Sequence, residues 1–148
     1  MNQIEIRKLT SRDLSAFKTL LLLFNQAFEE ERDLSNAEHL SVLLNNRQFV
    51  VLAACSGEEI LGGLTAYELP LYYGNETEIF LYDMAVHPDH QRKGIGKQLL
   101  EFLKDYCARN EINTFFVLAH KEDVHALEFY RATGGEREQV ANFIYEIK

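Results

Sequence analysis

A cluster of basic side chains surrounds two glycines near the middle of the chain, in the run Gln91, Arg92, Lys93, Gly94, Ile95, Gly96 and Lys97. An apolar helix pattern begins at these glycines, where the lack of a Cβ atom lets another molecule approach the backbone. The first N–H groups of a helix have no intrahelical partners, and they carry partial positive charge. The run therefore predicts an anion site, best matched to a phosphate or pyrophosphate. The alternative is a structural turn with a solvated basic patch, which the basic cluster in an acidic chain disfavours.

One acid, Asp83, interrupts the otherwise apolar run from Ile79 to Val86. Burying a carboxylate costs several kcal/mol unless the group is paired or has a function. Asp83 is therefore a candidate for acid–base chemistry. The alternative is a structural acid that neighbouring backbone groups or Tyr82 satisfy. Glu78, at the start of the same stretch, is the second candidate, although a glutamate at a strand end is more often merely exposed.

Hydrophobic periodicity places both features on regular elements. Aromatic and β-branched residues predict a buried strand over 78–86, and the spacing of Ile95, Leu99 and Phe102 predicts a helix after it. Similar patterns predict further strands over 3–9, 49–54, 60–69, 114–119 and 138–147, and further helices over 14–31, 36–44 and 122–132. This order predicts a mixed sheet with helices on both faces. The pair Gly62-Gly63 inside one strand indicates a bulge or close packing.

Composition limits the classes of protein that fit. A length of 148 residues predicts a single domain, and a formal net charge of −8 argues against nucleic-acid binding. The charge suits a cationic small molecule or a basic peptide, although the charge alone is better explained by surplus acid that keeps the protein soluble. The chain begins with no secretory leader, and the apolar run 20–24 is too short to span a membrane. Cys55 and Cys107 lack metal-site spacing, one bridge between them stays open, and a reducing cytoplasm is the simplest location.

Two motifs together resemble one superfamily. The run Q-R-K-G-I-G lacks the third glycine of a dinucleotide fingerprint, because position 99 is Leu, and it lacks the P-loop pattern. It resembles instead the Q/R-x-x-G-x-G/A signature of the GCN5-related N-acetyltransferase (GNAT) superfamily, which holds the pyrophosphate of acetyl-CoA. Asp123, Ala126, Phe129, Tyr130 and Gly134 resemble the N-x-x-A-x-x-F-Y-x-x-x-G helix of the same family. Asp123 replaces the usual Asn, and Gly135 stands where an aromatic residue often follows.

The resemblance covers essentially the whole chain and carries expectations for the fold. It implies one N-acetyltransferase domain over residues 1–148, with a mixed, mostly antiparallel sheet of six to seven strands and about four flanking helices. A narrower likeness, over residues 49–54, 62–70, 78–86 and 137–143, is to the type I aminoglycoside 3-N-acetyltransferases. That likeness implies a homodimer that acetylates the 3-amino group of an aminoglycoside antibiotic. It is weaker over residues 27–40, where acceptor specificity would be expressed.

The resemblance also implies roles for individual residues. Backbone groups of Met84, Ala85 and Val86 would pair with the pantetheine arm of acetyl-CoA, the run from Gln91 to Lys97 would hold its pyrophosphate, and Asp123, Ala126 and Phe129 would complete the cofactor site. Tyr130 would protonate the leaving thiolate. Asp83 would be the base that deprotonates the amine, with Glu78 as second choice. Candidate substrate contacts are Tyr67, Glu68, Tyr82, Asp83, Glu78, Glu138, Asn142 and the acidic run Glu29, Glu30, Glu31 and Asp33.

Several alternatives stay open. Within the same chemistry, the acceptor could be a polyamine, an amino-sugar metabolite or a protein N-terminus. A non-catalytic module that senses acyl-CoA is the alternative from another class, and a nucleic-acid-binding domain is disfavoured by the net charge. The histidines at 87, 90, 120 and 125 show no metal-ligand spacing, and acetyl transfer by this route needs no metal.

Overall fold

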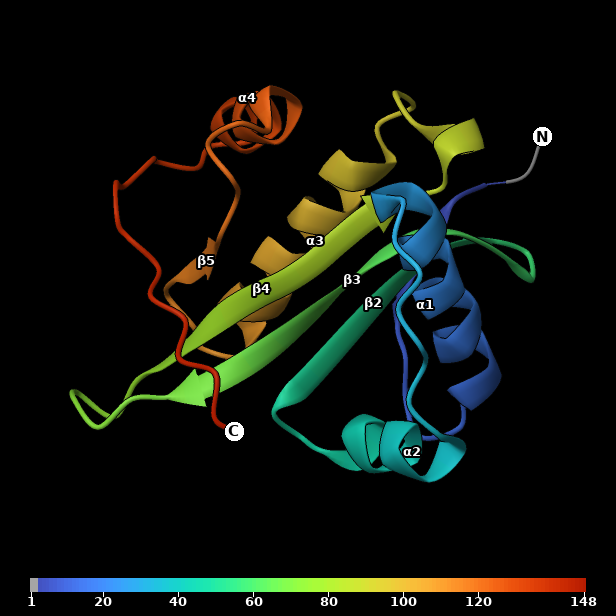
Figure 1. Cartoon of the computed structure of the whole chain (residues 1–148), viewed down its shortest axis with the longest axis horizontal. Helices are drawn as coiled ribbons and strands as arrows, with labels where there is room; N and C mark the ends of the chain where they lie inside the picture. Colours follow the sequence, from blue (N-terminus) through green and yellow to red (C-terminus); the bar gives the residue numbers. More distant parts are fainter. Residues whose placement is uncertain (1–2) are drawn as a thin grey trace. The chain divides into compact units, whose positions relative to one another are not determined.

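The computed structural model describes residues 3–148, and the chain divides into two compact units, Met1–Leu118 and Ala119–Lys148. The first unit is built on a five-stranded sheet in the order β1-β2-β3-β4-β5 (Figure 1). Its strands are β1 Glu5–Lys8, β2 Phe49–Ser56, β3 Glu59–Pro70, β4 Thr77–Val86 and β5 Phe115–Val117. Neighbouring strands are antiparallel except β4 and β5, which are parallel. A parallel pair needs a crossover, and helix α3 (Ile95–Arg109) supplies it.

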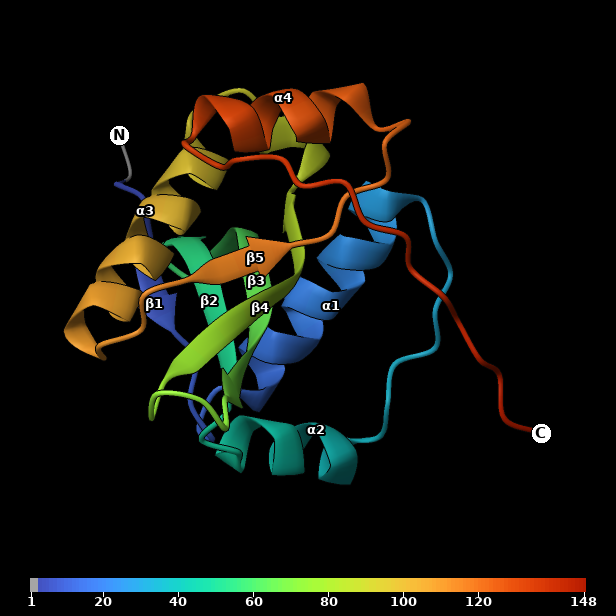
Figure 2. The same ribbon diagram turned by 90° about the vertical axis from the view of Figure 1, so that its left-hand side faces the viewer.

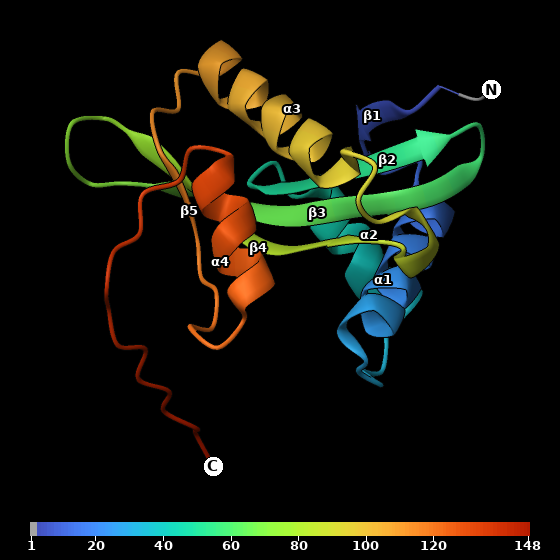
Figure 3. The same ribbon diagram turned by 90° about the horizontal axis from the view of Figure 1, so that it is seen from above.

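Helices cover both faces of this sheet. Helices α1 (Leu14–Phe28) and α2 (Ala37–Asn45) lie on one face and α3 lies on the other, as Figures 2 and 3 show from two directions. On the first face the buried side chains of α1 and α2 pack against those of the strands, among them Phe17, Leu20, Phe24, Leu40, Phe49, Val51 and Ala53. The expected mixed sheet with helices on both faces is confirmed, and so are the mostly antiparallel pairing and the four helices.

The helix ends follow their local sequence. Asn36 caps α2, since its side chain accepts a 2.8 Å hydrogen bond from the N–H of His39. Helix α1 ends at Phe28, three residues before the predicted end, because Glu29 adopts a left-handed backbone conformation with φ of 55°. The acidic run therefore lies in an exposed loop that follows α1.

The glycine pair Gly62-Gly63 in β3 shows both predicted features, a bulge and close packing. The register between β2 and β3 shifts beside it, where Ala54 pairs with Gly62 but Cys55 pairs with Ile60. A Cβ atom on Gly63 would lie 2.5 Å from the carbonyl oxygen of Leu52 and 2.7 Å from Cδ1 of Leu20. Gly63 thus lets α1 pack directly on the sheet.

The second unit contains helix α4, Val124–Ala132, and no strand. The predicted strand over 138–147 is wrong, and the sheet has five strands where the resemblance predicted six to seven. The segment keeps the apolar residues expected of a strand, but its large apolar side chains are 68% to 93% exposed, namely Val140, Phe143, Ile144, Tyr145 and Ile147. A strand exists only where another strand pairs with it, and no segment within residues 3–148 pairs with residues 138–147.

No helix within residues 3–148 is both long enough and apolar enough to cross a membrane.

The close approach at Gly63 yields a test of the fold. Gly63→Ala should lower the free energy of unfolding by about 1–3 kcal/mol, because the methyl group overlaps a backbone carbonyl that cannot move aside. Urea denaturation measures the loss. Gly57→Asn is the matched control, since a side chain at position 57 meets no atom within 4 Å and Asn tolerates its φ of 62°. Equal midpoints for Gly63→Ala and the wild type would contradict the packing described.

Candidate active site

A bulge in β4 forms the centre of the candidate site. Thr65 pairs with Asp83 and Ala66 pairs with Leu81, so that Tyr82 is an extra residue without a partner on β3. Directly opposed residues on neighbouring strands share a face, which puts Asp83 on the face of Thr65. The pair Tyr67 and Phe80 lies on that same face.

The bulge therefore reverses the alternation of side chains along β4. Tyr67 belongs to the cluster that packs against α1 and α2, so Asp83 also faces these two helices. The ring of Tyr82 lies 5.8 Å from that of Tyr67, edge to face, which places it on the same side. Two adjacent residues, Tyr82 and Asp83, thus serve one site.

The environment of Asp83 opposes its ionisation. Its side chain is only 25% exposed, and this burial raises the pKa of the carboxyl group above its ordinary value. Arg32, with Nη1 3.8 Å from Oδ2 of Asp83, lowers that pKa in part, whereas the charge of Glu30 raises it. Burial and the neighbouring Tyr82 and Asp83 also raise the pKa of Tyr67. A raised pKa makes the carboxylate a stronger proton acceptor than an ordinary aspartate.

A continuous row of aromatic rings runs from β2 to β5 beside Asp83. Ring centroids are 5.1 Å apart for Phe49 and Tyr67, 5.4 Å for Phe80 and Tyr82, and 4.8 Å for the stacked pair Phe80 and Phe116. Aromatic faces attract cations, so the row offers an ammonium group a favourable surface next to a carboxylate.

The edge of β4 next to this row is open. β5 pairs only with Ile79–Leu81 of β4, and within residues 3–148 no strand pairs with Tyr82–Val86 on that side (Figure 1). Such an edge can pair with an extended ligand as if the ligand were another strand. Met84, Ala85 and Val86 lie along it, as the predicted pantetheine contact requires.

The basic turn follows directly on this edge. Gly94 caps α3 with a left-handed φ of 82°, a Cβ atom there would meet nothing within 4 Å, and no side chain caps the helix. Ile95 is buried and fixes the helix start, while Arg92, Lys93 and Lys97 are exposed around it. The side chain of Gln91 donates a 3.1 Å hydrogen bond to the carbonyl of Val86, which ties the turn to β4. The run predicted to hold an anion thus lies beside the open edge, and its binding of an anion stays a prediction.

Helix α4 carries the second motif. The carboxylate of Asp123 accepts a 3.1 Å hydrogen bond from the N–H of Ala126, so Asp caps this helix as Asn would. The rings of Phe129 and Tyr130 are 5.3 Å apart and both side chains are half-buried. The roles of these four residues toward acetyl-CoA stay predictions.

The other predicted substrate contacts lie on several different elements. Glu68 lies on the α3 face, where the hydroxyl of Tyr106 donates it a 2.5 Å hydrogen bond. Glu78 lies five residues before Asp83, about 17 Å along an extended strand. Glu29 is exposed beyond α1, while Glu138 and Asn142 are exposed in the second unit.

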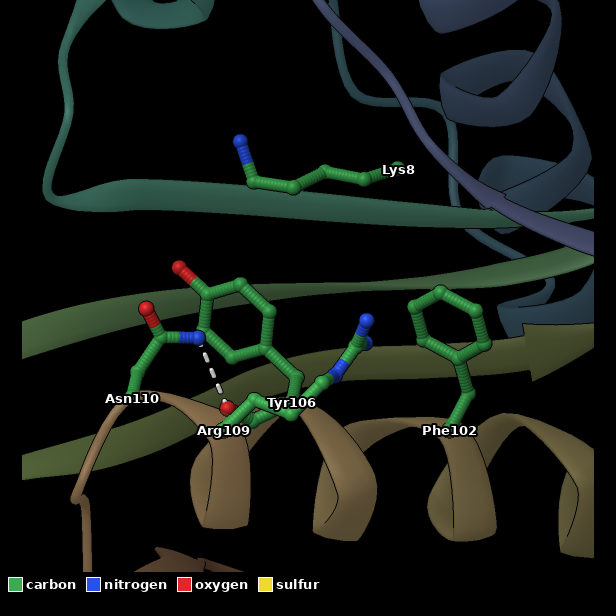
Figure 4. Close-up of a pocket in the computed structure, with 5 residues that line it drawn as sticks. All are labelled: Lys8, Phe102, Tyr106, Arg109 and Asn110. Carbon is green, nitrogen blue, oxygen red and sulfur yellow. Dashed lines mark hydrogen bonds between the residues drawn. The ribbon is translucent and has the colours of Figure 1, made fainter.

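The hollows in the surface lie along α3. One of about 310 Å³ is lined by Lys8, Phe102, Tyr106, Arg109 and Asn110 (Figure 4), and one of about 520 Å³ is lined by Phe102, Asp105, Ala108 and Arg109. Neither contains Asp83, which faces the opposite side of the sheet. The open strand edge, rather than an enclosed cavity, marks the candidate site.

The cysteines and histidines singled out in the sequence lie as follows. Cys55 and Cys107 are both free and buried, and burial raises the pKa of the Cys107 thiol to about 11. Within residues 3–148 no group of three His, Cys, Asp or Glu side chains could hold a metal ion. His87 caps the short 3-10 helix Pro88–His90 by accepting a hydrogen bond from the N–H of Asp89.

Sequence reasoning missed Arg32 and Thr65. Arg32 is the single positive charge among four negative ones in the run 29–33. This contrast is the sequence feature that could have pointed to Arg32. Thr65 is a buried polar residue opposite Asp83, and only the register of β3 and β4 shows this.

Comparison with known proteins shows the family to which the chain belongs. The family model described as the Acetyltransferase (GNAT) family matches residues 14–134, most of the chain. The chain belongs to the GNAT family. Both the basic turn and the whole α4 motif, Asp123 to Gly134, lie inside the matched range.

Solved structures of other GNAT proteins resemble this chain over its whole length. An aminoglycoside acetyltransferase, meta-AAC0020 from an uncultured soil metagenomic sample, is 38% identical in its complex with trehalose, with 98% of this chain and 97% of that one covered and a TM-score of 0.95. A structure of the same protein in complex with sisomicin is 37% identical, with the same coverage and TM-score. The aminoglycoside acetyltransferase HMB0005, also from uncultured soil, is 32% identical over 99% of both chains, with a TM-score of 0.93.

A curated GNAT relative matches over a shorter stretch. The [Ribosomal protein bS18]-alanine N-acetyltransferase of Escherichia coli strain K12 is 33% identical over 57 residues, which is 38% of this chain. The match likewise spans only 38% of the length of that relative.

The raised pKa of Asp83 predicts a cost in stability. Folding favours the protonated form, so the contribution of this group to stability is greatest below its unfolded pKa, ordinarily 3.8, and is lost as the pH rises through its folded pKa. Asp83→Asn should therefore raise the urea midpoint at pH 7, and the gain should shrink as the pH falls toward 4. Asp105→Asn, on the exposed side of α3, is the control. A variant less stable than wild type at pH 7 would show that the ion pair with Arg32 outweighs burial.

Proposed function

We propose that this GNAT protein is an N-acetyltransferase that moves the acetyl group of acetyl-CoA to an amine of a polycationic small molecule. The observation that carries the proposal is the bulge at Tyr82 and Asp83. It places a carboxyl group of raised pKa beside an unpaired strand edge and an aromatic row. A base, a place for an extended acyl donor and a surface for a cation are the three parts that amine acetylation needs.

The residues of the first unit suit acetyl-CoA as the acyl donor. The open edge along Met84, Ala85 and Val86 offers hydrogen bonds to the pantetheine amides, and the N–H of Met84 or Ala85 would polarise the thioester carbonyl. The turn from Gln91 to Lys97 would hold the pyrophosphate with its backbone N–H groups and basic side chains. Arg92, Lys93 and Lys97 are exposed around a glycine cap with open surroundings, which leaves room for a pyrophosphate beside positive charges.

The chemical step balances with two protein groups. Asp83 accepts a proton from the acceptor ammonium, directly or through water, and the free amine attacks the thioester carbonyl. The C–N bond forms, the C–S bond breaks, coenzyme A leaves as a thiolate, and the acetylated nitrogen releases its second proton to solvent. Tyr130 donates the proton that the thiolate takes up, a role supported by the motif around it on α4.

An aminoglycoside is the acceptor class that the comparisons support best. The similar protein meta-AAC0020 is called an aminoglycoside acetyltransferase, and one of its structures contains sisomicin. The proposed site of transfer is the 3-amino group, as the likeness to type I 3-N-acetyltransferases implies, which would make the protein a resistance enzyme. The same likeness supports a homodimer, the isolated cysteines favour a reducing cytoplasm, and the chain length supports one domain over residues 1–148.

A protein N-terminus is the second candidate acceptor. The 57-residue match to an alanine N-acetyltransferase of ribosomal protein bS18 favours it. A peptide that begins with alanine therefore belongs in the same assay.

Thiol release in the presence of acetyl-CoA tests the function directly. Purified protein should release coenzyme A with gentamicin, and Asp83→Asn should lower kcat by about 10²-fold or more because the amine keeps its proton. Asp105→Asn should retain full activity. A comparable loss in Glu78→Gln, with Asp83→Asn active, would assign the base to Glu78. Turnover of the peptide alone would refute the aminoglycoside acceptor, and acetyl-CoA binding without any turnover would indicate a sensor.

Tyr130→Phe tests the proton donor. Removal of the hydroxyl should lower kcat by about 10²-fold while KM for acetyl-CoA stays within two-fold, because the ring still fills its place. Stopped-flow measurement of thiolate release follows this step. Phe129→Tyr, which adds a hydroxyl to the neighbouring ring, should not restore the rate in the double variant. An unchanged kcat in Tyr130→Phe would exclude Tyr130 as the donor.

A further inference from the structure

The loop that follows α1 places a cation of the protein itself beside Asp83. Arg32 Nη1 lies 3.8 Å from Oδ2 of Asp83, beyond hydrogen-bond distance, whereas Arg32 Nε lies 3.0 Å from Oε2 of Glu30. Asn25 Nδ2 donates a 2.8 Å hydrogen bond to the carbonyl of Arg32, which fixes the loop backbone to α1. The guanidinium carbon is 5.8 Å from the centroid of the Phe28 ring. The backbone at Arg32 is thus anchored, while its side chain bridges two acids.

The contact between Arg32 and Asp83 is easily broken. The Arg32 side chain is 48% exposed, and exposed ion pairs contribute little stability. Glu30 already holds Nε at the shorter distance, so the guanidinium keeps a partner when it leaves Asp83. When another cation displaces Arg32 from Asp83, only this one long ion pair is exchanged, and no buried charge is left unpaired.

Arg32 carries the same positive charge as the expected substrate, but it cannot react as the substrate does. A guanidinium stays protonated in proteins, so Arg32 cannot give Asp83 a proton or attack a thioester. It can only occupy the place of a cation. The titratable groups that face Asp83 are Arg32 and Glu30 from the loop, Tyr67 from β3 and Tyr82 from β4, and Arg32 is the one cation among them in the described part of the chain.

We propose that Arg32 occupies the position of the acceptor ammonium beside Asp83 in the free protein and is exchanged for that ammonium when the amine binds. This inference rests on the proposed function, because it concerns the same acceptor site. Until the amine arrives, Arg32 favours the ionised form of Asp83, which is the form that accepts a proton. After the exchange, Arg32 neutralises Glu30, and Glu29, Glu31 and Asp33 stay available to further ammonium groups of a polycation.

Removal of the competing cation should strengthen amine binding. Arg32→Gln should lower the Kd of gentamicin by about three-fold, measured by isothermal titration calorimetry at pH 7. Arg12→Gln, at the opposite end of α1, removes one exposed positive charge and controls for the general attraction between a more acidic protein and a polycation.

The pH dependence separates this exchange from a structural role. The acidic limb of kcat/KM should move to higher pH in Arg32→Gln, since Arg32 lowers the pKa of Asp83, and to lower pH in Glu30→Gln, since Glu30 raises it. Arg32→Lys should keep the wild-type limb. Titration of the Asp83 carboxyl ¹³C resonance, without any amine, should show the same two directions.

Two outcomes would overturn the inference: weaker gentamicin binding in Arg32→Gln, or an Asp83 titration equal to that of the wild type. Both are binding or titration measurements, so they stand whether or not the protein turns over. Suppose that Arg32→Gln binds gentamicin more tightly than the wild type, but that neither protein releases thiol with it. That result would support the exchange and refute the proposed function.

Discussion

The bulge in β4 is the constraint on which the site depends. One extra residue, Tyr82, reverses the side-chain alternation, so that Asp83 faces α1 and α2 together with Thr65 and Tyr67. In a regular strand Asp83 would lie on the face opposite Phe80 and Tyr82, and the acid and the aromatic row would belong to different sides of the sheet. The open edge of β4 begins at the same residue, since the pairing with β5 stops at Leu81.

At this bulge, the electrostatic environment that suits the proposed role of Asp83 as a base also lowers the stability of the fold. Burial beside aromatic rings makes an ionised Asp83 unfavourable, and Arg32 offsets that cost only from a distance of 3.8 Å. A closer bidentate pair would hold the carboxylate more firmly and would also lower its basicity. The loose pair that is observed leaves Asp83 able to accept a proton and leaves Arg32 held by Glu30.

Local sequence predicted most elements and several of their details. The start of α3 at Ile95, directly after Gly94, depends on residues within one helical turn, whereas the close packing at Gly63 also depends on Leu20 of α1. The segment over 138–147 failed for a different reason. Its apolar residues permit an extended chain, but a strand also requires a partner, and no pattern within ten residues supplies one.

The sequence by itself determined which chemistry is available: a basic glycine turn at a helix start, an acid in an apolar strand and a tyrosine in the α4 motif. These are properties of residue type and short spacing, so they survive without coordinates. Only the tertiary structure decided which residues meet. Glu68 faces Tyr106 on the α3 side although it adjoins Tyr67, and Arg32 reaches Asp83 across fifty-one positions of sequence. Register, bulges and loop paths depend on pairing between distant segments, which local propensity does not encode.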